Sequence, residues 1–234
     1  MLIESMTREE TFREIMRDLP LLKHWQRAKW KDELRSKFAH CPVFPAHAYR
    51  TWTSPNKNKW ETYFYCVSKK QVFRPEVQRL QVLSWVRFNA DNGRGAYSFS
   101  GFRTHSERMA VVKYIPHFFL RFHQRFIEPN HIDLTPFDGD LIRYFFFHNI
   151  DINIGAEPNG HVVYGTIPQG FIFGREEQNT FFTLKTYINY NILNHKKQEK
   201  LARILKLLNI WNSLPFEVQH SKPGSFKVAT QLKG

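Results

Sequence analysis

The sequence contains few of the residues that cross-link a protein or anchor it in a membrane. Cys41 and Cys66 are its only cysteines, and no Cys-x-x-Cys pair occurs. A zinc site built from paired cysteines is therefore nearly excluded, and two such cysteines fit a reducing compartment. No apolar run approaches the roughly 18 residues of a membrane-spanning helix, and the charged first residues do not resemble a secretory signal. We therefore expect a cytoplasmic protein with no membrane partner.

The short motifs of several enzyme classes are also missing. The sequence has no His-Glu-x-x-His zinc motif, no glycine-rich phosphate loop and no Gly-x-Ser-x-Gly elbow. His105 and Glu107 have the spacing found in zinc deaminases, but the Pro-Cys-x-x-Cys segment that completes such a site does not follow. His117 and His123 are not spaced to hold a metal ion together on one helix face. We therefore expect no metal and no cofactor.

Positive charge and aromatic side chains are abundant instead. The chain has 34 Lys and Arg residues against 21 Asp and Glu residues, a net charge of +13, and 22 phenylalanines. A domain this basic is biased toward polyanions, with nucleic acid first among them, although charge spread evenly for solubility is the alternative. Its 234 residues can bury a real core in one large domain or two small ones.

The first residues predict two helices. Thr7 is a plausible N-cap for a helix over 7–18, Glu10 completes a capping box, and Pro20 is expected to end this helix. A second, strongly basic helix is predicted over 21–38, with Lys29 and Arg35 as candidate nucleic-acid contacts. Its tryptophans and cations can form a binding surface, or they can belong to an ordinary amphipathic helix with aromatic residues inward.

Residues 47–100 then predict an antiparallel sheet. Aromatic and β-branched residues dominate the expected strands, and the turns between them are rich in Asn, Gly and Pro. The expected strands cover 49–53, 60–68, 77–88 and 96–99.

The second half predicts helices packed on a three-stranded antiparallel meander. Pro116 suits the first position of a helix that runs to about Ile127, because a proline lacks the N–H that would be unpaired there. Another helix is expected over 138–148, with Asp138 or a neighbour as its N-cap, and 109–114 can be strand or helix. The meander strands and the last helix are expected at 160–167, 170–174, 180–188 and 194–211.

The overall expectation is an α+β protein with N-terminal helices and an antiparallel sheet, followed by the helices, the meander and a C-terminal helix. Three regions are predicted: a helical and sheet region over 1–102, an α+β unit over 103–218, and a flexible tail over 219–234. The first two regions can also form one compact domain.

The helix over 116–127 carries the residues best suited to chemistry. Its helical spacing places His117, Arg121 and Arg125 on one side, opposite a phenylalanine-rich side. An imidazole titrates near neutrality and can serve as base or acid, and the helix start disfavours its charged form. Arginine makes bidentate contacts with phosphate. Such a stripe can bind and cut a phosphodiester, or it can be the solvated side of a core helix.

This order of elements and residues, over about 103–190, resembles the barnase/EndoU/colicin/RelE-like superfamily of metal-independent ribonucleases, and in particular its toxin-type members. The resemblance implies that His117 is the catalytic histidine and that Arg121 and Arg125 bind phosphate. It also implies a polar residue on the last strand, Thr186 or Tyr187, and we expect Lys185 and Tyr187 to contact nucleic acid.

The function implied is a toxin-like, metal-independent endoribonuclease of the kind carried by mobile elements, which cleaves RNA by attack of the 2′-hydroxyl group. A neutralising acidic protein is an expected partner of such a toxin. The alternative is a non-catalytic basic α+β protein that binds nucleic acid or an acidic protein through its charge.

Overall fold

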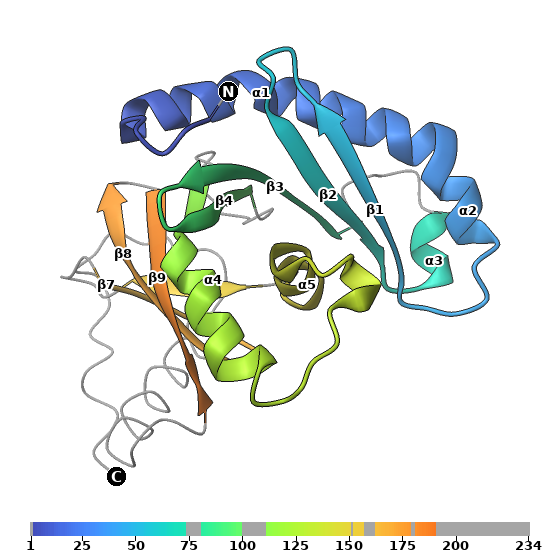
Figure 1. Ribbon diagram of the computed structural model, residues 1–234. Coiled ribbons are helices and arrows are strands. Elements are labelled where there is room, and N and C mark those ends of the chain that lie inside the picture. Colours follow the sequence, from blue (N-terminus) through green and yellow to red (C-terminus); the bar gives the residue numbers. More distant parts are fainter. Residues whose placement is uncertain are drawn as a thin grey trace, which may run out of the picture. The chain divides into compact units, whose positions relative to one another are not determined.

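The computed structural model describes residues 2–73, 81–99, 111–150, 152–156, 162–178 and 181–190. Met1–Tyr190 belong to one compact unit. Helices and one large sheet are combined in an α+β fold (Figure 1). No helix in these ranges is both long and apolar enough to cross a membrane. The helix expected over 194–211 and the tail over 219–234 lie outside the described residues.

The N-terminal helix α1 spans Arg8–Lys29 and continues through a π-helical turn, Trp30–Leu34, into α2, Arg35–Ala39. The predicted capping box is confirmed: Glu10 N donates to Thr7 Oγ1 at 3.2 Å, and Thr7 N donates to Glu10 Oε2 at 2.8 Å.

The predicted break at Pro20 is wrong, because Pro20 lies inside α1. A proline in a helix interior costs about 3 kcal/mol. The apolar residues Ile15, Leu19 and Leu22 are buried on both sides of it, and each such burial contributes about 1.5–3 kcal/mol. Packing of this continuous apolar face therefore outweighs the local penalty.

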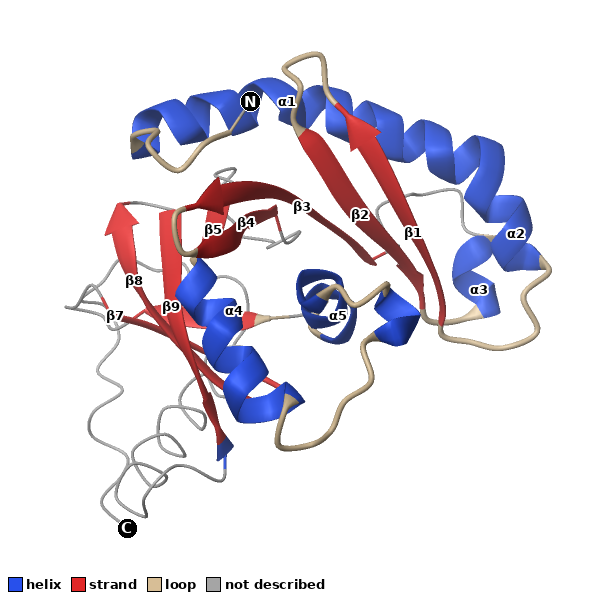
Figure 2. Ribbon diagram, viewed as in Figure 1, coloured by secondary structure: helices blue, strands red, loops and turns tan. Residues whose placement is uncertain are grey.

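A nine-stranded sheet forms the centre of the fold, with strand order β1-β2-β3-β4-β5-β9-β8-β7-β6 (Figure 2). Every neighbouring pair is antiparallel except β5 and β9, which are parallel. The strands are β1 Ala46–Thr53, β2 Lys59–Cys66, β3 Gln81–Ala90, β4 Gly93–Phe99, β5 Val111–Tyr114, β6 Asn153–Ala156, β7 Val162–Ile167, β8 Gly170–Gln178 and β9 Phe181–Asn189. The short helix α3, Lys69–Val72, follows β2.

The two expected sheets are one sheet. The predicted three-stranded meander has a fourth strand, β6, and β9 at its other side pairs with β5. Val111 and Val112 of β5 are fully buried, so this short strand gains most of its stability from neighbours on both faces. The sheet therefore crosses the expected boundary at residue 102.

Helices cover the two faces of the sheet. On β2 and β3, Tyr63 and Trp85 belong to the cluster that contains α4 (Pro116–Phe122) and α5 (Leu141–His148). Their neighbours Phe64 and Val86 belong to the clusters beneath α2 and α1. Because successive strand residues point to opposite faces, α4 and α5 lie on one face and α1 and α2 on the other.

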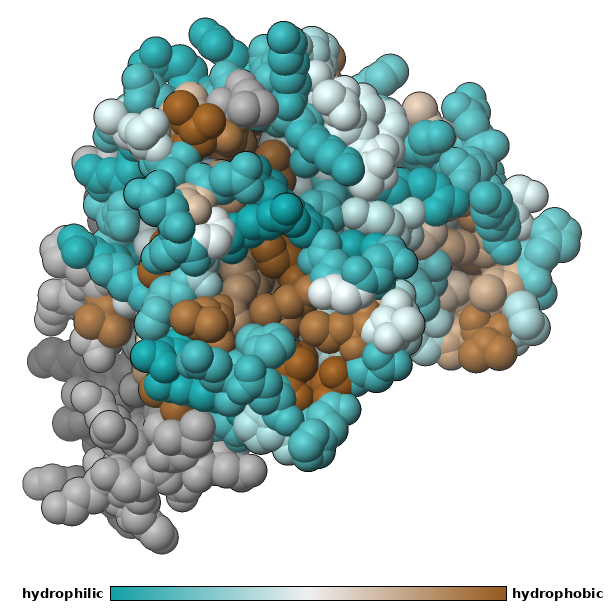
Figure 3. Space-filling model, viewed as in Figure 1, coloured by the Kyte–Doolittle hydropathy of each residue, from teal (hydrophilic) through white to brown (hydrophobic). Residues whose placement is uncertain are grey.

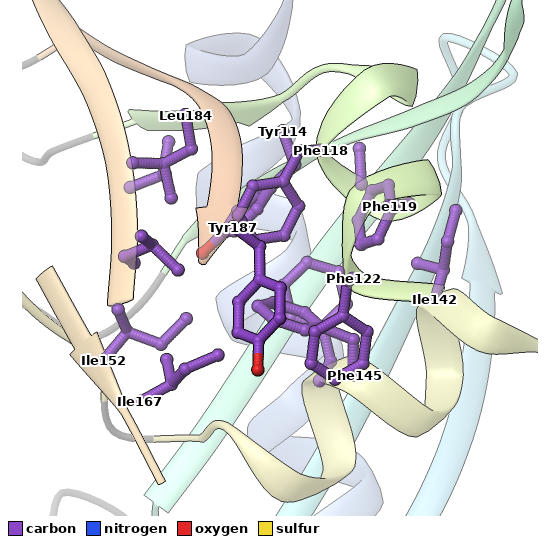
Figure 4. Close-up of a cluster of buried hydrophobic side chains, with 14 of the residues drawn as sticks. Tyr114, Phe118, Phe119, Phe122, Ile142, Phe145, Ile152, Ile167, Leu184 and Tyr187 are labelled. Atoms are coloured by element: carbon purple, nitrogen blue, oxygen red, sulfur yellow. The ribbon is translucent and has the colours of Figure 1, made fainter. Parts of the chain in front are cut away.

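Aromatic rings fill the core between the sheet and α4 and α5. Phe118, Phe122 and Phe145 are fully buried, and the rings of Phe122 and Phe145 have centroids 5.2 Å apart in an edge-to-face arrangement (Figure 4). Apolar surface also gathers over α4 and α5 in Figure 3. These contacts fix the orientation of α4, and with it the direction of its polar side.

Candidate functional site

The polar side of α4 is set by where its phenylalanines pack. The helix begins at Pro116, as predicted, and continues beyond Phe122 as a π-helical turn, His123–Ile127. Phe118, Phe119 and Phe122 are buried in the core. The side chains that remain on the partly exposed side include the predicted residues His117, Arg121 and Arg125, which we call the α4 stripe.

Within the α4 stripe, His117 and Arg121 are in direct contact. Arg121 Nε donates to His117 Nε2 at 3.2 Å, and Arg121 Nη1 donates to Gln124 Oε1 at 2.9 Å. Because a guanidinium can only donate, Nε2 of His117 is the acceptor of this bond. A lone pair able to take a proton therefore lies beside a fixed positive charge.

The third member of the stripe joins α4 to the sheet. Arg125 Nη1 donates to Tyr187 O at 2.6 Å, and Asn189 Nδ2 donates to Arg125 O at 3.0 Å. Burial, together with the nearby charge of Arg121, lowers the pKa of Arg125, although a guanidinium stays charged at neutral pH. The two guanidinium groups are thus close enough to repel each other.

Neither Arg121 nor Arg125 forms an ion pair with a carboxylate in the described part of the chain. The acidic side chain at the end of this segment, Glu128, pairs with His123 instead, at 3.0 Å. Two adjacent cations without a carboxylate form a surface that attracts an anion, and their planar groups match the oxygens of a phosphate.

The structure does not bring Thr186 to this site. Leu184 and Tyr187 pack in the core cluster beneath α4, whereas Thr186 lies between them on the opposite face of β9. A bulge at the exposed Lys185 sets this alternation, because Thr186 pairs with Phe173 while Leu184 pairs with the next residue of β8.

Tyr187 is the alternative polar residue of the last strand, and its ring is fully buried. Its hydroxyl donates to Gln169 O at 2.6 Å, on the turn between β7 and β8. Its backbone carbonyl contacts the α4 stripe through Arg125. Tyr187 therefore positions an arginine and does not present its hydroxyl to a substrate.

The other predicted nucleic-acid contacts lie on different elements. Lys29 ends α1 and pairs with Glu33 at 3.3 Å, and Arg35 is exposed at the start of α2. The buried residues of this region pack against β1 and β2 rather than in the cluster that contains α4. Lys29 and Arg35 therefore belong to a separate basic surface.

A charged network that no motif in the sequence indicated lies between β2, β3 and α5. Glu61 is buried and accepts hydrogen bonds from Tyr49 Oη and Arg87 Nη2, both at 2.6 Å. Arg87 Nη2 also pairs with Asp140 Oδ2 at 2.6 Å, and Asp140 caps α5 by accepting from Ile142 N. The only signal was one glutamate in the middle of an apolar strand.

This network is structural, since its members neutralise one another. Burial alone would lower the pKa of Arg87, but hydrogen bonds to Glu61 and Asp140 outweigh it and raise that pKa. Burial and the bond to Glu61 raise the pKa of Tyr49. Arg87 and Tyr49 thus both keep their protons, which suits an anchor for α5 better than an acid or a base. In the described ranges, no three His, Cys, Asp or Glu side chains are grouped to hold a metal ion.

Comparisons with protein-family models, with curated proteins and with solved structures found no match.

Proposed function

We propose that the protein is a metal-independent endoribonuclease and that the α4 stripe is its active site. One observation carries the proposal: Nε2 of His117 accepts a hydrogen bond from Arg121, beside the second guanidinium of Arg125. Neither arginine has a carboxylate partner among the described residues. A base and two cations at one place are what metal-free cleavage of RNA needs.

In the proposed reaction, the scissile phosphate takes the place of His117 as the partner of Arg121. Nε2 of His117 then accepts the proton of the 2′-hydroxyl group, and the 2′-oxygen attacks phosphorus. The bond from phosphorus to the 5′-oxygen breaks, and the proton that His117 accepted passes through a water molecule to the leaving oxygen, which restores the imidazole. The products are a 2′,3′-cyclic phosphate and a 5′-hydroxyl end, while Arg121 and Arg125 stabilise the charge that develops on the phosphate oxygens.

The order of elements supports the same proposal. Along the chain, the helix α4 with the α4 stripe is followed by a second helix, α5. The antiparallel meander β6–β9 comes after them. The ribonuclease superfamily that the sequence resembles has this order. Thr186 is not part of the proposed site, because it faces away from α4.

A cleavage assay in excess EDTA tests the proposal. Purified protein should convert a fluorescently labelled single-stranded RNA into fragments that end in a 2′,3′-cyclic phosphate. His117→Ala should lower the rate about 10²–10⁴-fold, the usual contribution of a positioned general base. His123→Ala is a matched control, since His123 is on the same segment but pairs with Glu128. Equal cleavage by wild type and His117→Ala, or none by wild type, would refute the proposal.

Binding without cleavage is the second candidate function. It is favoured by the engagement of Arg125 with Tyr187 O and by the absence of a second titratable group in the α4 stripe. In this case the protein binds RNA with an affinity that falls steeply with salt, and Arg121→Ala weakens binding on every RNA sequence. Salt-dependent binding with no fragments in the EDTA assay would establish this candidate over the first.

A further inference from the structure

The open edge of β1 lies in a groove. A cavity of about 630 Å³ is lined by five successive residues of this strand, 46–50. Because successive residues point to opposite faces, the cavity extends over both sides of the strand. Phe38 of α2 lines it on one side, and Phe137 and Phe147 from the segment around α5 line it on the other. Among the strands that the structure describes, β1 is the last on this side of the sheet, and its one pairing partner there is β2.

Backbone groups of β1 point out of the sheet into this region. Ser54 N donates to Asn58 O at 2.9 Å, so the pair that follows Thr53 and Lys59 is a hydrogen-bonded one. Hydrogen-bonded and non-hydrogen-bonded pairs alternate along an antiparallel ladder. The N–H and C=O groups of residues 47, 49, 51 and 53 therefore point away from β2.

One side-chain contact agrees with this alternation. Arg50 Nη1 donates to Tyr49 O at 2.7 Å, which requires that this carbonyl points outward. The outward backbone groups of His47 and Thr51 have no hydrogen-bond partner in the residues that the structure describes. The edge thus offers donors and acceptors at the spacing of a β-strand, which a peptide backbone can pair with and a nucleic acid cannot.

The charge of the groove points to an acidic occupant. Lys37, Arg50 and Arg143 line it, and no carboxylate does. Glu33, outside the groove, pairs with Lys37 at 2.9 Å, with Arg50 and with Lys29, so one carboxylate serves three cations. Arg143 pairs with the exposed Asp138 and lies over the Tyr49 ring, 4.2 Å from its centre.

We infer that this groove binds an extended, acidic segment of a partner protein, which adds to the sheet as a strand beside β1. Its backbone pairs with the outward groups of His47, its acidic side chains face Arg143 and Lys37, and its apolar side chains pack on Phe147 or Phe38. A second copy of this chain is a poor occupant, because pairing two β1 edges would bring the same cations together. The inference stands apart from the ribonuclease proposal, since it uses none of the α4 stripe.

The probe is a library of random dodecapeptides displayed on phage and selected against the full chain. Enriched peptides should carry Asp or Glu among alternating apolar residues. Synthetic forms of these peptides should bind His47→Pro with an affinity at least about tenfold lower than their affinity for His47→Ala. Both variants lose the imidazole, but only the proline also removes an outward N–H, and one lost hydrogen bond is worth about a factor of ten.

Thr53→Pro is the matched control. Thr53 N–H points outward in the same way, but Thr53 does not line the groove, so this variant should bind the peptides as wild type does. Prolines at outward positions of an edge strand leave the β1–β2 ladder intact, and the same melting temperature in both variants checks this.

Three results would overturn the inference. The first is a selection that enriches no peptide, and the second is equal peptide binding by His47→Pro and His47→Ala. The third is a different occupant: dimers that His47→Pro disrupts in sedimentation experiments, or single-stranded RNA whose binding this proline weakens. RNA cleavage by His47→Pro should match that of wild type, which separates the outcome from that of the proposed function.

Discussion

Replacing Asp18 by alanine should destabilise the protein by about 4 kcal/mol. Asp18 is fully buried on α1 and accepts three hydrogen bonds of 2.8 Å, from Asn56 Nδ2, Asn58 Nδ2 and Trp60 Nε1. These bonds fix α1 to the β1–β2 hairpin close to Pro20, where the helix is weakest.

The size of this loss of stability depends on the buried N–H groups that the substitution would leave without an acceptor. Asn58 and Trp60 are 1% and 0% exposed, so water cannot replace the lost carboxylate there. Asn58 Nδ2 would keep one bond, to Glu14 Oε1 at 3.3 Å, and lose the acceptor of its other hydrogen. Asn56 is partly exposed and can be hydrated. Each buried donor without a partner costs about 1–3 kcal/mol, which gives about 4 kcal/mol for two. Asp18→Asn should cost less, since its amide oxygen still accepts one or two of these bonds.

Urea denaturation followed by tryptophan fluorescence measures this change. Asp18→Ala should move the midpoint without changing the slope, and a 4 kcal/mol loss should lower the melting temperature by about 10 °C in a domain of this size. Asp32→Ala is the control: Asp32 is exposed on the π-helical turn, and its removal should change stability by less than about 0.5 kcal/mol. A loss below about 1 kcal/mol for Asp18→Ala would show that the buried N–H groups bonded to Asp18 do not need this acceptor for stability.

Three further changes test other parts of the fold in the same denaturation assay. Partial burial lowers the pKa of His148 below its ordinary 6.5, so His148 binds a proton more readily in the unfolded chain than in the folded one. Stability should therefore fall as the pH drops below about 6.5. His148→Gln should reduce this loss, and an unchanged pH profile of stability in this variant would contradict the prediction. Glu61→Gln should cost about 1.5–3 kcal/mol, because Arg87 would exchange a charged acceptor for a neutral amide while it keeps Asp140 as a partner, and a near-neutral effect would exclude that cause. Gly174→Ala should cost more than about 2 kcal/mol, since a Cβ there would lie 2.0 Å from Thr183 O, and wild-type stability would disprove the clash.

Local signals in the sequence predicted local structure well. The capping box at Thr7, the helix start at Pro116 and the hairpin around the 54–58 turn were all predicted and are all present. Each depends on residues within a few positions of one another. The α5 N-cap is Asp140 rather than Asp138, within the usual uncertainty of an element boundary.

Long-range packing decided what the sequence could not predict. Pro20 predicts a helix end, but the apolar face that α1 lays on the sheet continues across it. Likewise, 109–114 was compatible with strand or helix, and its pairing with β9, from a distant part of the chain, makes Val111–Tyr114 a strand. Neither outcome depends on neighbours in sequence.

The candidate site shows the same division. Helical spacing correctly predicted that His117 and Arg121 would be adjacent, because both lie on one helix. The orientation of Thr186 could not be predicted, since one bulge residue, Lys185, decides which face of β9 each side chain takes. The groove along β1 could not be predicted either, because it is formed by segments that meet only in the folded chain.

The parallel pairing of β5 with β9 has a consequence for how the protein folds. β1–β5 and β6–β9 are built from strands that follow one another in the chain, so their hairpins can form early. The four residue pairs between Val111–Tyr114 and Phe181–Leu184 can form only after a long loop of the chain has closed. During synthesis, β5 therefore emerges with one edge unpaired long before its partner is made, and this apolar strand is where a nascent chain is most exposed to aggregation.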